Sequence, residues 1–132
     1  MSYKNQVILE PIAENKFLTK IGRKAGKYFP LRWEAFEFML GKIELLLLKK
    51  ENNTITDNGN ILLCKLYFKS EQNKSAKDSG SRCIVTWHKE ERIVKILLVY
   101  TKDHIKNSNE TVWWKKMIKD NYPEYHELVG RI

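Results

Sequence analysis

Residues 80–106 read GSRCIVTWHKEERIVKILLVYTKDHIK, and this stretch decides the fold. It contains two β-type runs, Ser81–His88 and Ile93–Tyr100, separated by four charged residues. Two such runs on either side of a short polar turn predict an antiparallel hairpin. Lys95 is the single interruption of the apolar second run. We therefore expect this second strand to be covered on both faces and to form the centre of a sheet.

Basic residues stand at the open end of this predicted hairpin. Arg82 enters the first strand, while Lys102, His104 and Lys106 follow the second strand. These two ends lie side by side in an antiparallel pair. Arg82 and Lys102 are therefore expected to face one point in space, which predicts an anion site.

The remaining chain supplies a first strand, a weakly helical segment, a long amphipathic helix, a further strand and a last helix. Their expected ranges are Gln6–Leu9, a helix from Ile12, Leu31–Lys50, Ile61–Lys69 and Ser108–Asp120. The segments Glu51–Asn60 and Ser70–Gly80 are expected to be loops, and the residues after Pro123 a tail. Asn107 and Glu110 resemble a capping box at the start of the last helix. The expected fold class is α+β: a small, mostly antiparallel twisted sheet packed by two N-terminal helices, plus a C-terminal helix, in one domain over residues 1–132.

Two groups of aromatic residues leave alternatives open. Trp33 and Phe38 lie beside the apolar stripe of the long helix, so they belong either to the core or to a docking surface, and we favour the core. Trp113 and Trp114 are either packed or available to stack bases. Adjacent helical residues point about 100° apart, so we expect at most one of them to face the core squarely, and we favour packing.

Composition narrows the class of partner. The chain has 24 basic and 16 acidic residues among 132, and Ile61–Lys106 alone holds ten basic against five acidic residues. Such a regional positive field suits a polyanion, most often nucleic acid, and less often an acidic protein or a membrane surface. Cys64 and Cys83 have no metal-ligand spacing, so we expect buried thiols, no metal and no cofactor. Because no membrane-spanning run or secretory leader is visible, we expect a cytoplasmic protein with no membrane association.

The chemistry follows from cations gathered with tyrosine and histidine. No Gly-rich phosphate loop, GxSxG or HExxH motif is present. Cations can, without a metal, assist the attack of a ribose 2′-hydroxyl on its own phosphodiester, because they neutralise the charge that gathers on the phosphorane oxygens. A lysine, histidine or tyrosine would move the proton. The alternative is that these cations only hold phosphate.

The sequence resembles the RelE/HigB-like toxins of bacterial type II toxin–antitoxin systems, within the RelE/ParE superfamily. The resemblance rests on Gly80-Ser81-Arg82-Cys83-Ile84-Val85, a polar turn, and Ile96-Leu97-Leu98-Val99-Tyr100-Thr101-Lys102, and it covers residues 61–119. It implies a RelE-like fold and a ribosome-dependent mRNA endoribonuclease that needs no metal. It also implies a cognate antitoxin as partner, while the oligomeric state stays open.

The resemblance also implies roles for individual residues. Arg82 would contact the scissile phosphate, Lys65 and Lys102 would match further basic positions, and His104 is a candidate for proton transfer. Relatives often have a second basic residue where this chain has Tyr67, so Lys69 would substitute. The expected catalytic residues are Lys65, Arg82, Lys102 and His104, and the expected RNA-binding residues are Tyr67, Lys69, Lys74, Lys77, Tyr100, Lys106, Lys20 and Lys24.

Two rival functions share the fold without RNA cleavage. One is inhibition of DNA gyrase, as in ParE-like relatives, and the other is a non-catalytic RNA-binding protein. A third, plainer alternative is an interaction protein whose positive charge serves solubility. The set formed by Lys65, Arg82 and Lys102 favours the nuclease over the gyrase inhibitor.

Overall fold

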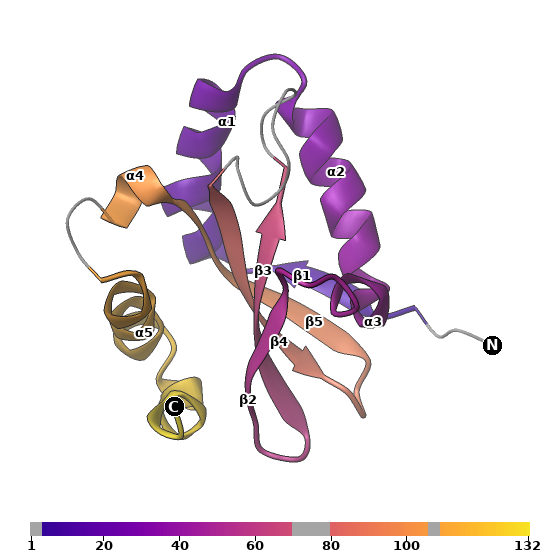
Figure 1. Cartoon of the computed structure of the whole chain (residues 1–132), viewed down its shortest axis with the longest axis vertical. Helices are drawn as coiled ribbons and strands as arrows, with labels where there is room; N and C mark the ends of the chain where they lie inside the picture. The colour runs from indigo at the N-terminus through magenta and orange to yellow at the C-terminus, as the bar shows by residue number, and fades with distance from the viewer. Residues whose placement is uncertain (1–3, 70–79, 106–108) are drawn as a thin grey trace.

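The computed structural model describes residues 4–69, 80–105 and 109–132, and its centre is one five-stranded sheet (Figure 1). The strand order is β1-β5-β4-β3-β2, and neighbouring strands are antiparallel except for the parallel pair of β1 and β5. The strands are β1 (Gln6–Leu9), β2 (Asn53–Asp57), β3 (Ile61–Phe68), β4 (Ser81–His88) and β5 (Ile93–Thr101). The α+β class and the mostly antiparallel sheet are confirmed.

The predicted hairpin is formed by β4 and β5. Its register pairs Arg82 with Tyr100 and His88 with Ile93. β5 is buried on both faces, as its apolar run predicts, but β4 is the middle strand of the sheet. The prediction that β5 forms the centre was therefore wrong by one strand, because β1 adds a single short partner outside β5.

The N-terminal helices follow β1. A π-helical stretch, η1 (Ala13–Leu18), continues into α1 (Thr19–Ala25), and α2 and α3 come next. The predicted single helix over 31–50 is interrupted, giving α2 (Phe29–Leu40) and α3 (Ile43–Leu46). Gly41 lies at the break, where its carbonyl accepts hydrogen bonds from the backbone N–H and the side chain of Asn5. A Cβ on Gly41 would lie 3.3 Å from the Asn5 carbonyl oxygen, so glycine permits this close approach.

The C-terminal part differs most from the sequence prediction. It contains α4 (Lys102–Ile105), α5 (Glu110–Asn121), η2 (Pro123–Tyr125) and α6 (His126–Gly130). The cap of α5 is Asn109, whose side chain accepts a hydrogen bond from the Val112 N–H at 3.1 Å, and Asn107, for which this role was predicted, lies outside the described residues. The predicted tail is folded, since Tyr125, Leu128 and Val129 are buried. The predicted loop at 51–60 likewise contains β2.

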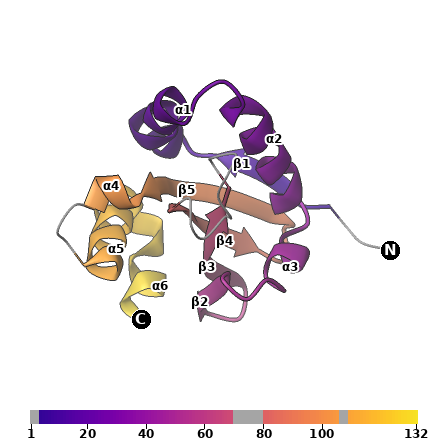
Figure 2. The same cartoon turned by 45° about the horizontal axis from the view of Figure 1, so that its top comes forward.

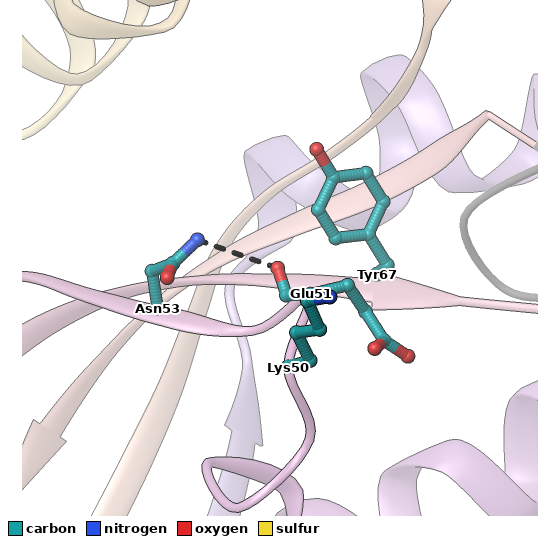
Figure 3. A pocket seen from close by; sticks show the side chains of 4 residues that line it. All are labelled: Lys50, Glu51, Asn53 and Tyr67. Carbon is teal, nitrogen blue, oxygen red and sulfur yellow. Dashed lines mark hydrogen bonds between the residues drawn. The ribbon is translucent and has the colours of Figure 1, made fainter.

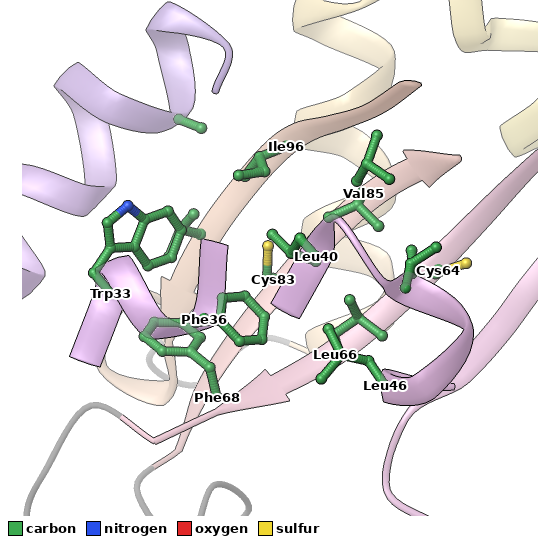
Figure 4. Packing of buried hydrophobic residues seen from close by; sticks show 14 of the residues in the cluster. Trp33, Phe36, Leu40, Leu46, Cys64, Leu66, Phe68, Cys83, Val85 and Ile96 are labelled. Atoms are coloured by element: carbon green, nitrogen blue, oxygen red, sulfur yellow. The ribbon is translucent and has the colours of Figure 1, made fainter. Parts of the chain in front are cut away.

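One face of the sheet packs against α2 and α3. The rings of Trp33, Phe36 and Phe68 lie together, with centroids of Phe36 and Phe68 5.1 Å apart (Figure 4). Leu40 and Leu66 are fully buried beside them. Trp33 is therefore core, as favoured. Phe38, which we also favoured as core, is 53% exposed, so that prediction was wrong for this residue.

The opposite face packs against α5, η2 and α6, so Figure 2 shows the sheet between N-terminal and C-terminal helices. Trp114 and Ile118 are buried here, and Trp113 is partly buried against Tyr100, with ring centroids 5.0 Å apart. Packing is thus the observed role of both tryptophans. The hydroxyl of Tyr122 donates to the Leu97 carbonyl at 2.6 Å, which ties the end of α5 to β5.

The two cysteines are buried free thiols. Burial raises the pKa of Cys64 to about 11, so this thiol is protonated at neutral pH. Within residues 4–69, 80–105 and 109–132, no helix combines the length and apolar character needed to cross a bilayer.

Candidate functional site

Three adjacent strands bring two of the predicted basic residues, Lys65 and Arg82, together with two tyrosines. In the β3–β4 register Tyr67 pairs with Arg82, and in the β4–β5 register Arg82 pairs with Tyr100. Paired residues share a face of the sheet, and Lys65 lies on that same face because it is two residues from Tyr67. Alternation along the strands therefore places these four side chains together on the face that α5 covers.

The carboxylate of Glu110 lies at the centre of this group. Its Oε2 atom forms an ion pair with Lys65 Nζ, and it accepts hydrogen bonds from Arg82 Nε and the Tyr100 hydroxyl, each at 2.9 Å. One oxygen atom thus receives donors from β3, β4 and β5. We name Lys65, Arg82, Tyr100 and Glu110 the carboxylate cluster.

The start of α5 positions this carboxylate. Asn109 caps the helix, so Glu110 is its first residue. Trp114 and Ile118 lie on the buried side of α5 and hold it against β5. The first helical turn also favours a negative charge, because the unpaired backbone N–H groups point toward it.

The cluster shifts the pKa of its members. Burial raises the pKa of Glu110, but hydrogen bonds from Lys65 and Tyr100 and the charges of Lys65 and Arg82 outweigh it, so the pKa lies below the ordinary value. Burial, followed by the Glu110 charge, raises the pKa of Tyr100 well above the usual range. At neutral pH the carboxyl is therefore ionised, and the phenol keeps its proton and donates it in a hydrogen bond.

Tyr67 lies against the two cations. The Arg82 guanidinium carbon is 4.9 Å from the Tyr67 ring centroid, and Lys65 Nζ is 5.5 Å from it. Both distances fall within the range of cation–π attraction. The Tyr67 ring thus helps to hold Lys65 and Arg82.

Gly80 brings Arg82 close to the end of β5. Its φ of +74° is a conformation that favours glycine, and its carbonyl accepts a hydrogen bond from Arg82 Nη1. A Cβ at this position would lie 3.6 Å from Arg82 Nη1 and 3.8 Å from Lys102 Cγ. Arg82 and the stem of Lys102 therefore meet at Gly80, as the open end of the hairpin predicts.

The predicted residues His104, Lys69 and Lys20 are not members of the carboxylate cluster. His104 Nδ1 accepts hydrogen bonds from Thr101, and its ring packs edge-on against Phe17 with centroids 5.3 Å apart. Lys69 follows β3 and lines a groove beside α2 and α3, so the structure does not bring it into the carboxylate cluster. Lys20 is exposed on α1. Lys74, Lys77, Lys106 and the side chain of Lys24 lie outside the described residues.

The arrangement is suited to binding an oxyanion. A guanidinium, an ammonium and a neutral phenol O–H all point at one oxygen, and charge-assisted hydrogen bonds of this kind are the strong ones. Among the described residues, no three histidine, cysteine, aspartate or glutamate side chains are placed to share a metal ion. The chemistry that these side chains can supply is electrostatic stabilisation and proton donation.

Comparison with known proteins identifies the architecture. No protein-family model matches the chain, and no curated protein matches its sequence. A chain in the crystal structure of the archaeal RelE–RelB complex from Pyrococcus horikoshii OT3 aligns with a TM-score of 0.53 and 15% identity, covering 77% of this chain and 97% of that chain. The fold is RelE-like. The RelE-like fold agrees with the expectation from the sequence, whereas the finer HigB-type likeness stays part of that expectation.

Glu110 is the site residue that the sequence prediction missed. The sequence pattern assigns it to helix capping, because an acidic residue in the first turn of a helix is sufficient to explain its presence. One feature of the sequence does point to Glu110 as a partner for the cations: it is an acidic residue that follows a stretch in which basic residues outnumber acidic ones two to one. Its contacts depend on how α5 packs across β5, which a local pattern does not specify.

Proposed function

We propose that this chain is the toxin of a type II toxin–antitoxin pair and cleaves mRNA on the ribosome, in the cytoplasm, without a metal. The observation that carries the proposal is the convergence of Lys65, Arg82 and Tyr100 on a single carboxylate oxygen. A phosphodiester oxygen presents the same charge and hydrogen-bonding capacity. The RelE-like fold is consistent with this role.

In the proposed reaction the scissile phosphate takes the position of the Glu110 carboxylate. The ribose 2′-oxygen forms a bond to phosphorus as its proton leaves, the bond to the 5′-oxygen breaks, and that oxygen takes up a proton. Lys65 and Arg82 neutralise charge on the phosphorane oxygens, which is commonly the largest contribution to catalysis. The products are a 2′,3′-cyclic phosphate and a 5′-hydroxyl.

Three residues are assigned the hydrogen bonds and proton transfers. The raised pKa of Tyr100 keeps its hydroxyl protonated, so it donates a hydrogen bond to a phosphorane oxygen. Lys102 lies beside Arg82 at Gly80, and His104 follows it in α4. We assign to Lys102 and His104 the movement of protons to and from the ribose oxygens.

An antitoxin is the proposed protein partner, in line with the RelE–RelB pairing named for the structural neighbour. An amphipathic segment with acidic residues would neutralise the basic surface. The same amphipathic segment would also fit the outer side of α2, where Leu31 and Phe38 are exposed. The ammonium groups of Lys4 and Lys42 lie 4.6 and 5.4 Å from the centre of the Phe38 ring, so cations border this apolar surface. Co-production of the cognate antitoxin with this chain should restore growth.

The test is induced production in bacteria, combined with mapping of mRNA 5′ ends. Wild-type protein should arrest growth and cut mRNA, while Arg82→Ala should abolish both. Loss of an electrostatic donor costs about 10²–10³-fold in rate. Because Arg82 is buried, Tyr100→Phe serves as a milder variant that keeps the ring and removes only the hydroxyl. Lys89→Ala, at the far end of β4, is the matched control and should behave as wild type.

Three results would contradict the nuclease proposal. Arrest that persists undiminished in folded Arg82→Ala removes this arginine from the site. DNA damage with intact mRNA indicates a ParE-like gyrase inhibitor. RNA that is bound but never cut, in reactions with and without ribosomes, indicates an RNA-binding protein of the same fold.

A further inference from the structure

Exposed apolar side chains gather on one part of the molecule. Among the described residues, seven large apolar side chains are exposed, and five of them lie on or next to α2 and α3. These five are Tyr28, Leu31, Phe38, Leu45 and Leu48. Clustered exposed apolar side chains mark an interaction surface.

The outer face of α2 is hollowed between its bulky side chains. A hollow of about 470 Å³ is lined by Leu31, Glu34, Ala35, Phe38 and Met39. The first four have the spacing i, i+3, i+4 and i+7, which is the set of residues that receives one inserted side chain when two helices pack together. Ala35 has the smallest side chain of the set, so it leaves room at the centre.

This hollow differs from the one beside the carboxylate cluster. At the start of β2, a hollow of about 340 Å³ is lined by Lys50, Glu51, Asn53 and Tyr67 (Figure 3). All four of these side chains carry a polar group, whereas four of the five that line the α2 hollow are apolar. The α2 hollow therefore suits an apolar side chain of a protein partner.

The charge of α2 and α3 favours a second copy of this chain as that partner. Residues 29–46 contain two basic and three acidic residues, in a chain whose net charge is +8. Two copies repel one another through their net charge, and the repulsion is weakest where the local charge is close to zero. Because α2 and α5 lie on opposite sides of the sheet, contact through α2 leaves the carboxylate cluster uncovered (Figure 1).

The order of charges along α2 fits an antiparallel pair. Glu34 is exposed and precedes Phe38 by four residues, which places both on one side of the helix. The Lys42 ammonium lies 5.4 Å from the centre of the Phe38 ring, and Lys42 itself follows the end of α2. The outer face thus presents a carboxylate, an aromatic ring and an ammonium in that order. When two copies run in opposite directions, each carboxylate comes near the ammonium of the other copy.

We propose that α2 pairs with α2 of a second copy in an antiparallel, two-fold symmetric dimer. Phe38 of each copy enters the hollow over Ala35 of the other, and Lys42 of each copy lies near Glu34 of the other. One helix face buries less than the ~800 Å² per partner of a standard interface, so we expect a micromolar dissociation constant. An antitoxin that docks on this face would displace the second copy. The inference involves no RNA, so it is independent of the nuclease proposal.

The test is sedimentation velocity of the purified chain at about 1–100 μM, a range that brackets a micromolar dissociation constant. Wild type should change from monomer to dimer across this range. Phe38→Glu should weaken the dimer more than about tenfold, because it places a charge at the centre of the interface. The Phe38 ring is 53% exposed in the single chain, so this variant should fold. Val112→Glu, at a 65% exposed residue of α5, is the matched control and should leave the dimer unchanged.

An exchange of charges tests the antiparallel direction. Lys42→Glu should weaken the dimer about tenfold, because it opposes Glu34 of the other copy with a like charge. The two-fold symmetry repeats this repulsion on both sides of the axis. Adding Glu34→Lys to the same chain should restore wild-type affinity, because both ion pairs then form again with their charges exchanged.

Four results would overturn the dimer or its geometry. A wild-type chain that stays monomeric at about 100 μM excludes the dimer. An unaltered dimer in Phe38→Glu places the interface away from α2. A double variant that associates no more tightly than Lys42→Glu excludes the antiparallel pairing. A monomeric chain whose complex with a co-produced antitoxin is lost in Phe38→Glu assigns this face to the antitoxin instead.

Discussion

On the face covered by α2 and α3, packing centres on aromatic rings and aliphatic side chains, whereas the face covered by α5, η2 and α6 carries a polar network at each end. At one end, Glu110 joins Lys65, Arg82 and Tyr100. At the other end, the Tyr125 hydroxyl contacts the Thr86 hydroxyl at 3.1 Å and His88 Nε2 at 3.0 Å.

These two networks differ in exposure, and the difference indicates their roles. Thr86, His88 and Tyr125 are buried, so their hydrogen bonds join β4 to the C-terminal segment. The side chain of Glu110 remains 24% exposed, so this carboxylate is partly open to solvent. The first face therefore provides stability, while the second combines stability at one end with the proposed anion site at the other.

The largest expected effect comes from a substitution in the apolar core between the sheet and helices α2 and α3. Leu66→Ala should destabilise the protein by ~2–5 kcal/mol, because it removes a fully buried side chain and leaves a cavity. Urea unfolding followed by circular dichroism measures the change. Leu48→Ala is the matched control, since this side chain is 81% exposed and should have little effect. Similar losses in both variants would contradict the assigned packing.

The buried network of Thr86, His88 and Tyr125 should be less stable when the Tyr125 hydroxyl is removed. Tyr125→Phe should cost ~1–3 kcal/mol, because Thr86 and His88 would lose their partner inside the protein. The same unfolding measurement detects it, and RNA binding should be unchanged. Tyr28→Phe, on a half-exposed ring, serves as the control. An unaltered stability in Tyr125→Phe would show that this network does not hold the C-terminal segment.

The carboxylate cluster should respond to loss of the Glu110 charge mainly in affinity and less in stability. Glu110→Gln removes the negative charge that competes with phosphate, so affinity for a short RNA should rise about fivefold, the size expected for a partly exposed ion pair. Anisotropy with 2′-O-methyl oligonucleotides measures the rise. Glu127→Gln makes the same charge change on exposed α6 and should produce a smaller one. Weaker binding in Glu110→Gln would instead make the carboxylate part of the ligand site.

The two networks should also lose their contributions to stability at different pH values. Burial, and then the charge of Lys95, lowers the pKa of His88 from 6.5, so its contribution to stability is complete above pH 6.5 and is lost as pH falls through the folded-state pKa. Glu110 contributes above pH 4.5 and loses its contribution only in more acidic solution. The free energy of unfolding measured across pH should therefore fall in two steps. His88→Asn should remove the first step, and His126→Asn, at an exposed position, should keep it.

Local pattern was sufficient to predict the hairpin and the alternation of β3. Side chains alternate strictly between the faces of a strand, so the position of Lys65 relative to Leu66 follows from the sequence alone. The two ends of a hairpin lie side by side, which places Arg82 near Lys102. The break between α2 and α3 was not predictable in this way, because it depends on Asn5, 36 residues distant along the chain.

The C-terminal segment shows the same limit. Its residues after Pro123 have little helical periodicity, yet Tyr125, Leu128 and Val129 are buried because the sheet offers a second apolar face. β2 was missed for a related reason: its polar sequence NTITD becomes a strand by pairing with β3 at the sheet edge. In both cases the partner surface decides the structure.

The sequence by itself determined β1, β3, β4, β5, the hairpin and the cations that the hairpin brings together, since these depend on the two-residue period of a strand and on a short turn. Only the tertiary structure decided that Glu110 would lie among those cations and that Tyr67 would line a hollow beside them. Both contacts join segments far apart in the chain, and packing of α5 and of the loop before β2 against the sheet selects them.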